Sequence, residues 1–306
     1  MNRKKKISSK NKLWLWAVPI AVVVIIAVIV SVNFLSREND ITLKHIHGLG
    51  FTNDGTQLLI PAHEGLISFS EDHWKALNGK KHDYMGLNMT DNGFYSSGHP
   101  EFGSGLRNPL GIVKSNDYGE NLEILDLYGV EDFHGMAVGY QTHTIYVINA
   151  QPNERMSEPG LYVTTDETKS WRKSEINGIN SAVSSISAHP TNPGTVAVGT
   201  SSGVFLSNDY GDQFKKLASD QEVTALAFGK NGDLFIGGRG TLQQQTGNTL
   251  KNLSLTSSDL ESVIVYIAQN PQNDNEIAYA TSNMDVFVSK DSGLNWNQIT
   301  EKGSAM

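Results

Sequence analysis

The chain has 306 residues, enough for one large domain or two ordinary ones with a well-buried core. Charged residues make up only 18% of it and 29 residues are glycine, which excludes a coiled coil and a highly charged disordered chain. Because the chain has no cysteine, disulfides, thiolate zinc sites, iron–sulfur clusters and cysteine nucleophiles are also excluded.

The chain begins with a short basic segment, residues 1–12, which holds six of the 24 Lys and Arg residues. From residue 13 onward, 18 basic side chains stand against 32 acidic ones, a formal charge of −14. A body with this charge repels phosphate backbones, so we expect no nucleic-acid partner.

Residues 13–35 carry no charge and are rich in Val, Ile and Ala. At about 1.5 Å per helical residue, this run is long enough to cross a hydrocarbon core of about 30 Å. A cleaved signal peptide is the alternative, but its apolar region is usually ~7–15 residues long and ends at a small-residue cleavage site, which is not evident here. The positive charges then place the N-terminus in the cytoplasm. The sequence thus predicts a single-pass cell-membrane protein with a cytoplasmic tail (1–12), a transmembrane anchor (13–35), a linker (36–40) and an extracytoplasmic remainder.

A repeat of the form S/T-x-D-x-G-x-x-aromatic/Leu runs through residues 41–300. A shortened relative lies at Ser70–Trp74, and a degenerate copy is expected near Gly247–Leu250. The spacing implies six units of about 40–50 residues. The four clear copies begin at Ser115, Thr164, Ser207 and Ser289, with Thr168 in place of the glycine in the second.

Each unit also repeats the same order of short strands separated by Gly, Asn and Asp turns. Four short strands in a unit of this length are typical of a β-propeller blade. The sequence therefore predicts an all-β, six-bladed propeller over residues 41–300, with five or seven blades as alternatives, and a C-terminal tail at 301–306. In the fourth unit the expected strands are Val183–Ala188, Thr195–Gly199, Gly203–Ser207 and Phe214–Leu217.

The repeat resembles the Asp-box (BNR) repeat of sialidases, family 74 glycoside hydrolases, sortilin-type receptors and the photosystem II assembly propellers. In those families the box lies in the turn between the third and fourth strands, where its aspartate caps backbone amides. The first half, with HIHGLGF, PAHEGL and DFHGMAV, is most similar to a bacterial membrane-anchored propeller family usually labelled glycosyl hydrolase. The resemblance implies a structural role for four aspartates: Asp117, Asp166, Asp209 and Asp291.

Several histidines fall at equivalent positions of the first three units. In a propeller, the first strands line a central channel, and the loops between second and third strands open at the end where those first strands begin. Imidazole and carboxylate donors suit divalent Zn, Cu, Fe or Ni. We therefore predict a transition-metal site at the channel mouth with Asp132 or Glu64 as a further ligand; an acid–base cluster and a merely polar rim are alternatives. The predicted ligands are His47, His63, His99 and His134.

Other residues at the same end are candidates for ligand binding or catalysis. Tyr84 and Arg239 are predicted to contact a ligand. A glycosidase needs two carboxylates ~5–10 Å apart, which could come from Glu64, Glu101 and Asp132. A sialidase also needs an arginine triad, and of the arginines only Arg239 is expected at the channel mouth, which argues against that activity.

Two classes of function follow. The first is a membrane-anchored module that binds an unidentified protein or glycan at the propeller mouth. The second is a glycosyl hydrolase-like enzyme acting on extracellular or cell-wall glycan. The chain contains no GxSxG, Walker A or HExxH motif that would add a third class.

Overall fold

The computed structural model describes residues 19, 22, 23, 25, 41–218, 220–255 and 261–306. The predicted cytoplasmic tail and linker, and nearly all of the predicted transmembrane anchor, lie outside these residues. The described residues include no helix with the length and apolar character needed to cross a membrane. Residues 42–306 form one compact unit.

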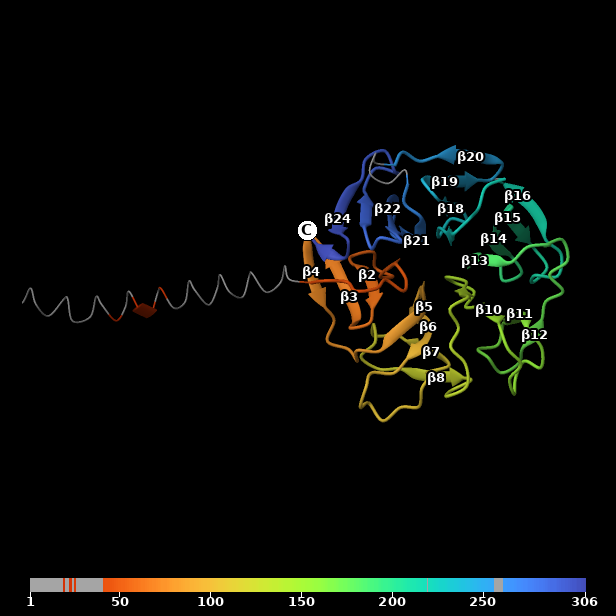
Figure 1. Ribbon diagram of the computed structural model, residues 1–306, viewed down its shortest axis with the longest axis horizontal. Coiled ribbons are helices and arrows are strands. Elements are labelled where there is room, and N and C mark those ends of the chain that lie inside the picture. Colours follow the sequence, from red (N-terminus) through yellow and green to blue (C-terminus); the bar gives the residue numbers. More distant parts are fainter. Residues whose placement is uncertain (1–18, 20–21, 24, 26–40, 219, 256–260) are drawn as a thin grey trace, which may run out of the picture. The chain divides into compact units, whose positions relative to one another are not determined.

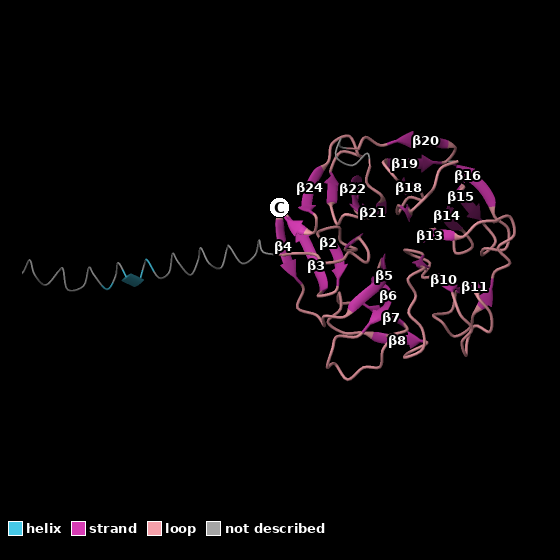
Figure 2. Cartoon of the chain, in the orientation of Figure 1, coloured by secondary structure: helices cyan, strands magenta, loops and turns pink. Residues whose placement is uncertain are grey.

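This unit is a six-bladed β-propeller, as the repeat predicted (Figure 1). Each blade is an antiparallel meander whose first strand lies nearest the central channel and whose last strand lies at the outer edge (Figure 2). Blade one contains β1 (Gly50–Phe51), β2 (Leu58–Ala62), β3 (Gly65–Ser70) and β4 (His73–Ala76). Blade two contains β5 (Asp83–Thr90), β6 (Gly93–His99), β7 (Ile112–Ser115) and β8 (Glu123–Asp126). Blade three contains β9 (Met136–Val138), β10 (Ile145–Asn149), β11 (Gly160–Thr164) and β12 (Arg172–Lys173).

The second half of the ring follows the same order. Blade four contains β13 (Val183–Ala188), β14 (Val196–Thr200), β15 (Gly203–Ser207) and β16 (Lys215–Ala218). Blade five contains β17 (Ala225–Phe228), β18 (Leu234–Gly238), β19 (Thr241–Thr246) and β20 (Thr249–Asn252). Blade six contains β21 (Ile264–Asn270), β22 (Asn273–Thr281), β23 (Val286–Ser289), β24 (Asn297–Glu301) and β25 (Ser304–Ala305). In blade four the predicted strands agree with the observed ones to within one residue at each end.

The Asp boxes form the turns between third and fourth strands. In blade six, Ser289 Oγ donates to Asp291 Oδ1 at 2.8 Å, and the same oxygen accepts the backbone N–H of Asn295 at 2.9 Å. The turn needs a left-handed residue, which is Gly293 with φ of 76°. Thr168 adopts the same conformation, with φ of 67°, in the copy that lacks glycine. The equivalent aspartates bond in the same way to a backbone N–H four residues later: Asp117, Asp166 and Asp209.

The ring closes through the two ends of the propeller sequence. Thr42 forms a β-bridge with Ser304, and the Leu43 N–H donates to the Gly303 carbonyl at 2.7 Å. β25 adds a fifth strand to blade six. Residues 301–306, predicted to be a tail, therefore belong mostly to the last blade, because their backbone pairs with β24 and with the start of the propeller.

The core lies between adjacent blades, where first and second strands contribute Val, Ile, Leu and aromatic side chains. Trp296 packs edge-on against Tyr279, with ring centroids 4.7 Å apart, which places an Asp-box aromatic ring against the interior of the same blade. The channel is lined by the six residues predicted from the repeat, one from each blade: Leu49, Leu87, Met136, Ile186, Leu226 and Ile267.

Candidate metal site at the channel mouth

Two histidines and an aspartate from three separate segments meet at the channel mouth. His47 lies just before β1, His63 lies in the tight turn between β2 and β3, and Asp83 is the first residue of β5. His63 Nδ1 is hydrogen-bonded to Asp83 Oδ2 at 2.6 Å, and His47 Nε2 lies 3.4 Å from Asp83 Oδ1. One donor atom from each residue lies within 4.8 Å of the other two. In the part of the chain that the structure describes, this is the one group of at least three His, Asp or Glu residues with such spacing.

The local chain geometry explains this meeting. The β2–β3 connection, which carries His63, is only two residues long, so His63 stays close to the end of β2. The His47 N–H donates to the Pro61 carbonyl at 3.0 Å, which fixes the segment before β1 alongside β2. Asp83 comes from the neighbouring blade, since β5 packs beside β1 and β2.

The site is partly shielded from water. The side chains of His47 and Asp83 are each 16% exposed, whereas that of His63 is 43% exposed. Burial lowers the pKa of His47; the negative charge of Asp83 opposes this shift, and neighbouring His63 and His45 add to it. His47 is therefore biased toward the neutral imidazole, the form that can coordinate a metal ion.

Two polar atoms of the site are buried without a hydrogen bond. Neither His47 Nε2 nor Asp83 Oδ1 has a hydrogen-bond partner among the described residues, although they lie 3.4 Å apart. A buried polar atom without a partner costs about 1–3 kcal/mol, so such atoms call for an explanation. The His45 ring lies 4.7 Å from the His63 ring, at the exposed side of the group.

A second group at the mouth is centred on Asp132. Asp132 Oδ2 lies 3.2 Å from His99 Nε2 and 2.9 Å from His134 Nε2. His99 Nδ1 also contacts Asn108 Oδ1 at 2.7 Å. The donor atoms of this trio do not meet the 4.8 Å spacing of the first group. His134 and His99 are also more exposed, with 69% and 41% of their side chains accessible.

The structure thus divides the predicted four-histidine site into two pairs. His47 and His63 share Asp83, and His99 and His134 share Asp132. The two groups are organised by different blades, so the expected set of four imidazoles around one ion is not formed. Asp83, the residue that joins the first pair, was not among the predicted ligands.

The predicted carboxylates other than Asp132 are engaged elsewhere. Glu64 pairs with Lys44, with 3.1 Å between Oε1 and Nζ, on the exposed surface. The Glu101 backbone N–H donates to His82 Nδ1 at 2.8 Å. His82 is 1% exposed, and its burial lowers its pKa, so a neutral imidazole holds the start of the loop after β6.

Tyr84 and Arg239 were predicted to contact a ligand. Tyr84 is fully buried and packs edge-on against Phe94 at 5.3 Å, so its side chain belongs to the core and is not available to a ligand. This corrects the prediction for Tyr84. Burial also raises its pKa. Arg239 lies in the β18–β19 turn of blade five, at the same end as His63, and donates to the Glu261 carbonyl at 3.0 Å.

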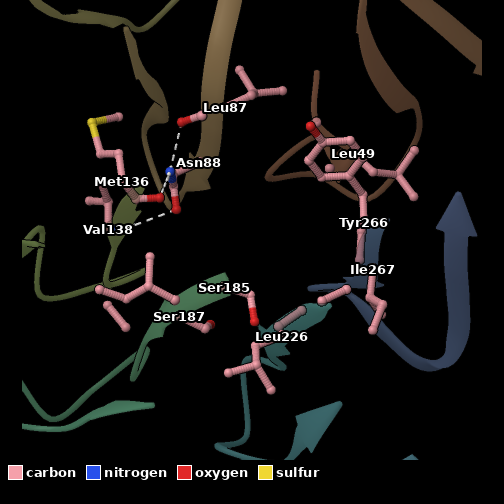
Figure 3. Close-up of a pocket in the computed structure, with 18 of the residues that line it drawn as sticks. Leu49, Leu87, Asn88, Met136, Val138, Ser185, Ser187, Leu226, Tyr266 and Ile267 are labelled. Carbon is pink, nitrogen blue, oxygen red and sulfur yellow. Dashed lines mark hydrogen bonds between the residues drawn. The ribbon is translucent and has the colours of Figure 1, made fainter. Parts of the chain in front are cut away.

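A cavity of about 710 Å³ opens from this mouth along the channel. His47, Asp132 and His134 form part of its lining, and the inner strands of all six blades form the rest. Figure 3 shows the side chains that point into it from several blades.

No protein family and no curated protein matches this chain in sequence. Solved structures match it well in fold. A family 74 glycoside hydrolase from Niastella koreensis superimposes with a TM-score of 0.56 and 15% identity, over 86% of this chain and 46% of that enzyme. The chain thus spans less than half the length of that enzyme. The xyloglucanase of the same family from Xanthomonas campestris gives a TM-score of 0.51 at 15% identity, with the same shares of the two chains covered.

A protein titled glucose dehydrogenase also matches, with a TM-score of 0.52 and 15% identity over 82% of this chain and 97% of that protein. These proteins differ in the reactions that their titles name, and their low identity to this chain supports a likeness in fold alone. The chain is therefore a six-bladed β-propeller similar in structure to the family 74 glycoside hydrolases, as its Asp boxes suggested.

Proposed function

We propose that this propeller is a binding module whose channel mouth holds a divalent transition metal through His47, His63 and Asp83. The observation that carries the proposal is the convergence of three donor groups within 4.8 Å, two of which present buried atoms without a hydrogen-bond partner among the described residues. A cation between His47 Nε2 and Asp83 Oδ1 would satisfy both atoms and remove the cost of burying them.

The donor set suits a metal such as Zn²⁺, Cu²⁺, Fe²⁺ or Ni²⁺, because two imidazoles and one carboxylate are nitrogen and oxygen ligands. Three protein donors also leave room for a ligand in the coordination sphere. His63 Nδ1 and Asp83 Oδ2, now hydrogen-bonded at 2.6 Å, would release a proton if both bound the ion.

Elemental analysis of the full-length protein, purified in mild detergent without a histidine tag, tests the proposal. We expect one equivalent of metal in the parent protein and a large loss in His63→Ala and Asp83→Asn. His143→Ala is the matched control, because His143 also forms a 2.6 Å pair with an aspartate, Asp91, but lies in the turn between β9 and β10. Equal metal in the parent and the two site variants would refute the site.

We further propose that residues 13–35 anchor the protein in the cell membrane, with the propeller outside and its mouth open to a protein or glycan. This proposal rests on the uncharged 23-residue run and the basic residues before it. Protease treatment of intact cells should digest the propeller, and treatment that spares it until the cells are lysed would contradict this orientation.

An enzyme of glycosidase type is the second candidate. It is favoured by Asp132, whose Oδ2 is held by two histidines while its buried Oδ1 has no hydrogen-bond partner among the described residues. Aryl glycosides and muropeptides are suitable substrates for a screen. Hydrolysis that Asp132→Asn abolishes would establish this function, and the absence of hydrolysis across the panel would leave the binding module.

A further inference from the structure

The cavity beneath the metal site has the size and the lining of a small-molecule pocket. Its volume of about 710 Å³ lies within the range of roughly 300–1,000 Å³ typical of ligand sites. Its wall carries one large apolar side chain from the first strand of each blade, or from just before it, as Figure 3 shows for several of them: Leu49, Leu87, Met136, Ile186, Leu226 and Ile267.

The polar side chains of this wall are mostly occupied by the protein itself. Asn88 donates to the Gly86 and Met136 carbonyls and accepts the Val138 N–H at 3.0 Å, which connects blades two and three (Figure 3). These bonds use the donors and the acceptor of its amide group, so Asn88 offers little to a ligand.

The hydroxyl groups of blades four and five behave in the same way. Ser187 Oγ accepts the Phe228 N–H at 3.0 Å, and Thr224 Oγ1 donates to the Ile264 carbonyl at 2.6 Å. Ser185 Oγ is buried against β14, where it would lie 2.3 Å from a Cβ added to Gly199. The middle of the channel therefore favours an apolar body over a sugar, whose hydroxyls would lose their bonds to water.

Charged groups gather at the mouth. His47, Asp132 and His134 line this end of the cavity, and the proposed metal is bound beside them. A divalent ion held by one carboxylate and two neutral imidazoles keeps a net positive charge, so an anionic oxygen group is the natural further ligand.

We infer that the channel binds a linear aliphatic carboxylate, whose head group coordinates the metal and whose hydrocarbon chain fills the apolar channel. This inference rests on the metal site of the proposed function. It goes beyond that site by assigning a ligand class from the contrast between the charged mouth and the apolar wall.

A chain-length series tests the inference. Butanoate, hexanoate and octanoate are titrated calorimetrically into the full-length, metal-loaded protein in detergent. Each added methylene buried in the channel should raise the affinity about fourfold. Alcohols of equal chain length should bind at least about tenfold more weakly, because they lack the charged head group.

Two variants separate binding in the channel from uptake by detergent. Leu226→Trp fills the channel and should remove the dependence on chain length without loss of metal; Leu226→Phe is the milder form should the first variant misfold. Leu217→Trp is the matched control, since Leu217 is 37% exposed on the outer strand of blade four, and should behave like the parent.

The outcomes distinguish the inference from the proposed function. Metal content is measured first, and its absence overturns the proposed metal site. If metal is present, an affinity that does not change with chain length, or that changes equally in Leu226→Trp and Leu217→Trp, overturns the inference about the channel alone.

Discussion

Asp83 and Tyr84 are adjacent in β5, yet their side chains serve opposite sides of the strand. Asp83 bonds to His63 at the channel mouth, while Tyr84 is fully buried and packs against Phe94. This alternation follows from the two-residue period of a β-strand. It explains why one of the two neighbours belongs to the candidate metal site and the other to the core.

The buried hydroxyl of Tyr84 leads to a prediction about stability. Tyr84 Oη has no hydrogen-bond partner among the described residues. Removing it in Tyr84→Phe should leave the free energy of unfolding unchanged or raise it by up to about 1 kcal/mol, because an unsatisfied buried hydroxyl is lost. Denaturant unfolding measures this change. A loss of more than about 1 kcal/mol would mean that the hydroxyl has a partner in solution.

A bound metal should stabilise the folded propeller. An ion that binds only the folded state at about 100 times its Kd contributes about 2.7 kcal/mol. We expect a chelator to lower the Tm of the parent protein by several degrees and to have no effect on Asp83→Asn. Calorimetry in the presence and absence of the chelator compares the two proteins. An equal response in both would show that any stabilising metal lies elsewhere.

The Asp boxes should make part of the stability depend on acid pH. Hydrogen bonds from the Asn295 side chain and backbone lower the pKa of Asp291 from 3.8 to about 2. Because the folded pKa is depressed, the stabilisation is complete above the unfolded pKa and is lost as the pH falls through about 2. Asp291→Asn should therefore have a lower Tm than the parent at neutral pH, with a difference that shrinks below pH 3.8.

Thermal melts between neutral pH and pH 2 measure that difference. Asp274→Asn is a suitable control, because Asp274 is an exposed residue at the start of β22 outside any Asp box. A Tm difference for Asp291→Asn that is independent of pH would show that its charge contributes nothing to folding.

Closure of the ring gives the fourth prediction. Leu43 is 1% exposed, and its backbone pairs with Gly303 where the start of the propeller meets its last blade. Leu43→Ala should lower the free energy of unfolding by about 2–5 kcal/mol, the usual cost of truncating a buried leucine. Leu294→Ala should change it by less than about 0.5 kcal/mol, because Leu294 is 63% exposed. Similar losses in the two variants, measured by urea unfolding, would contradict this role of Leu43.

The sequence by itself determined the architecture. Asp291 and its counterparts recur at nearly constant intervals, and the local chemistry of each box, an aspartate with a glycine or Thr168 in a left-handed turn, is independent of distant contacts. Strand patterns around these turns were equally local, so the number of blades, the strands of blade four and the six channel residues could be predicted.

The tertiary structure decided which side chains meet at the mouth. Equivalent positions in different blades lie at similar heights but at different points around the ring, so the four histidines separated into pairs around Asp83 and Asp132. The sequence placed Asp83 and Tyr84 at the start of one strand, but the direction of each side chain depended on how β5 packs beside blade one. The contacts of His47 with Asp83 and of Leu43 with Gly303 join segments from different blades or opposite ends of the propeller, and no local pattern specifies such pairings.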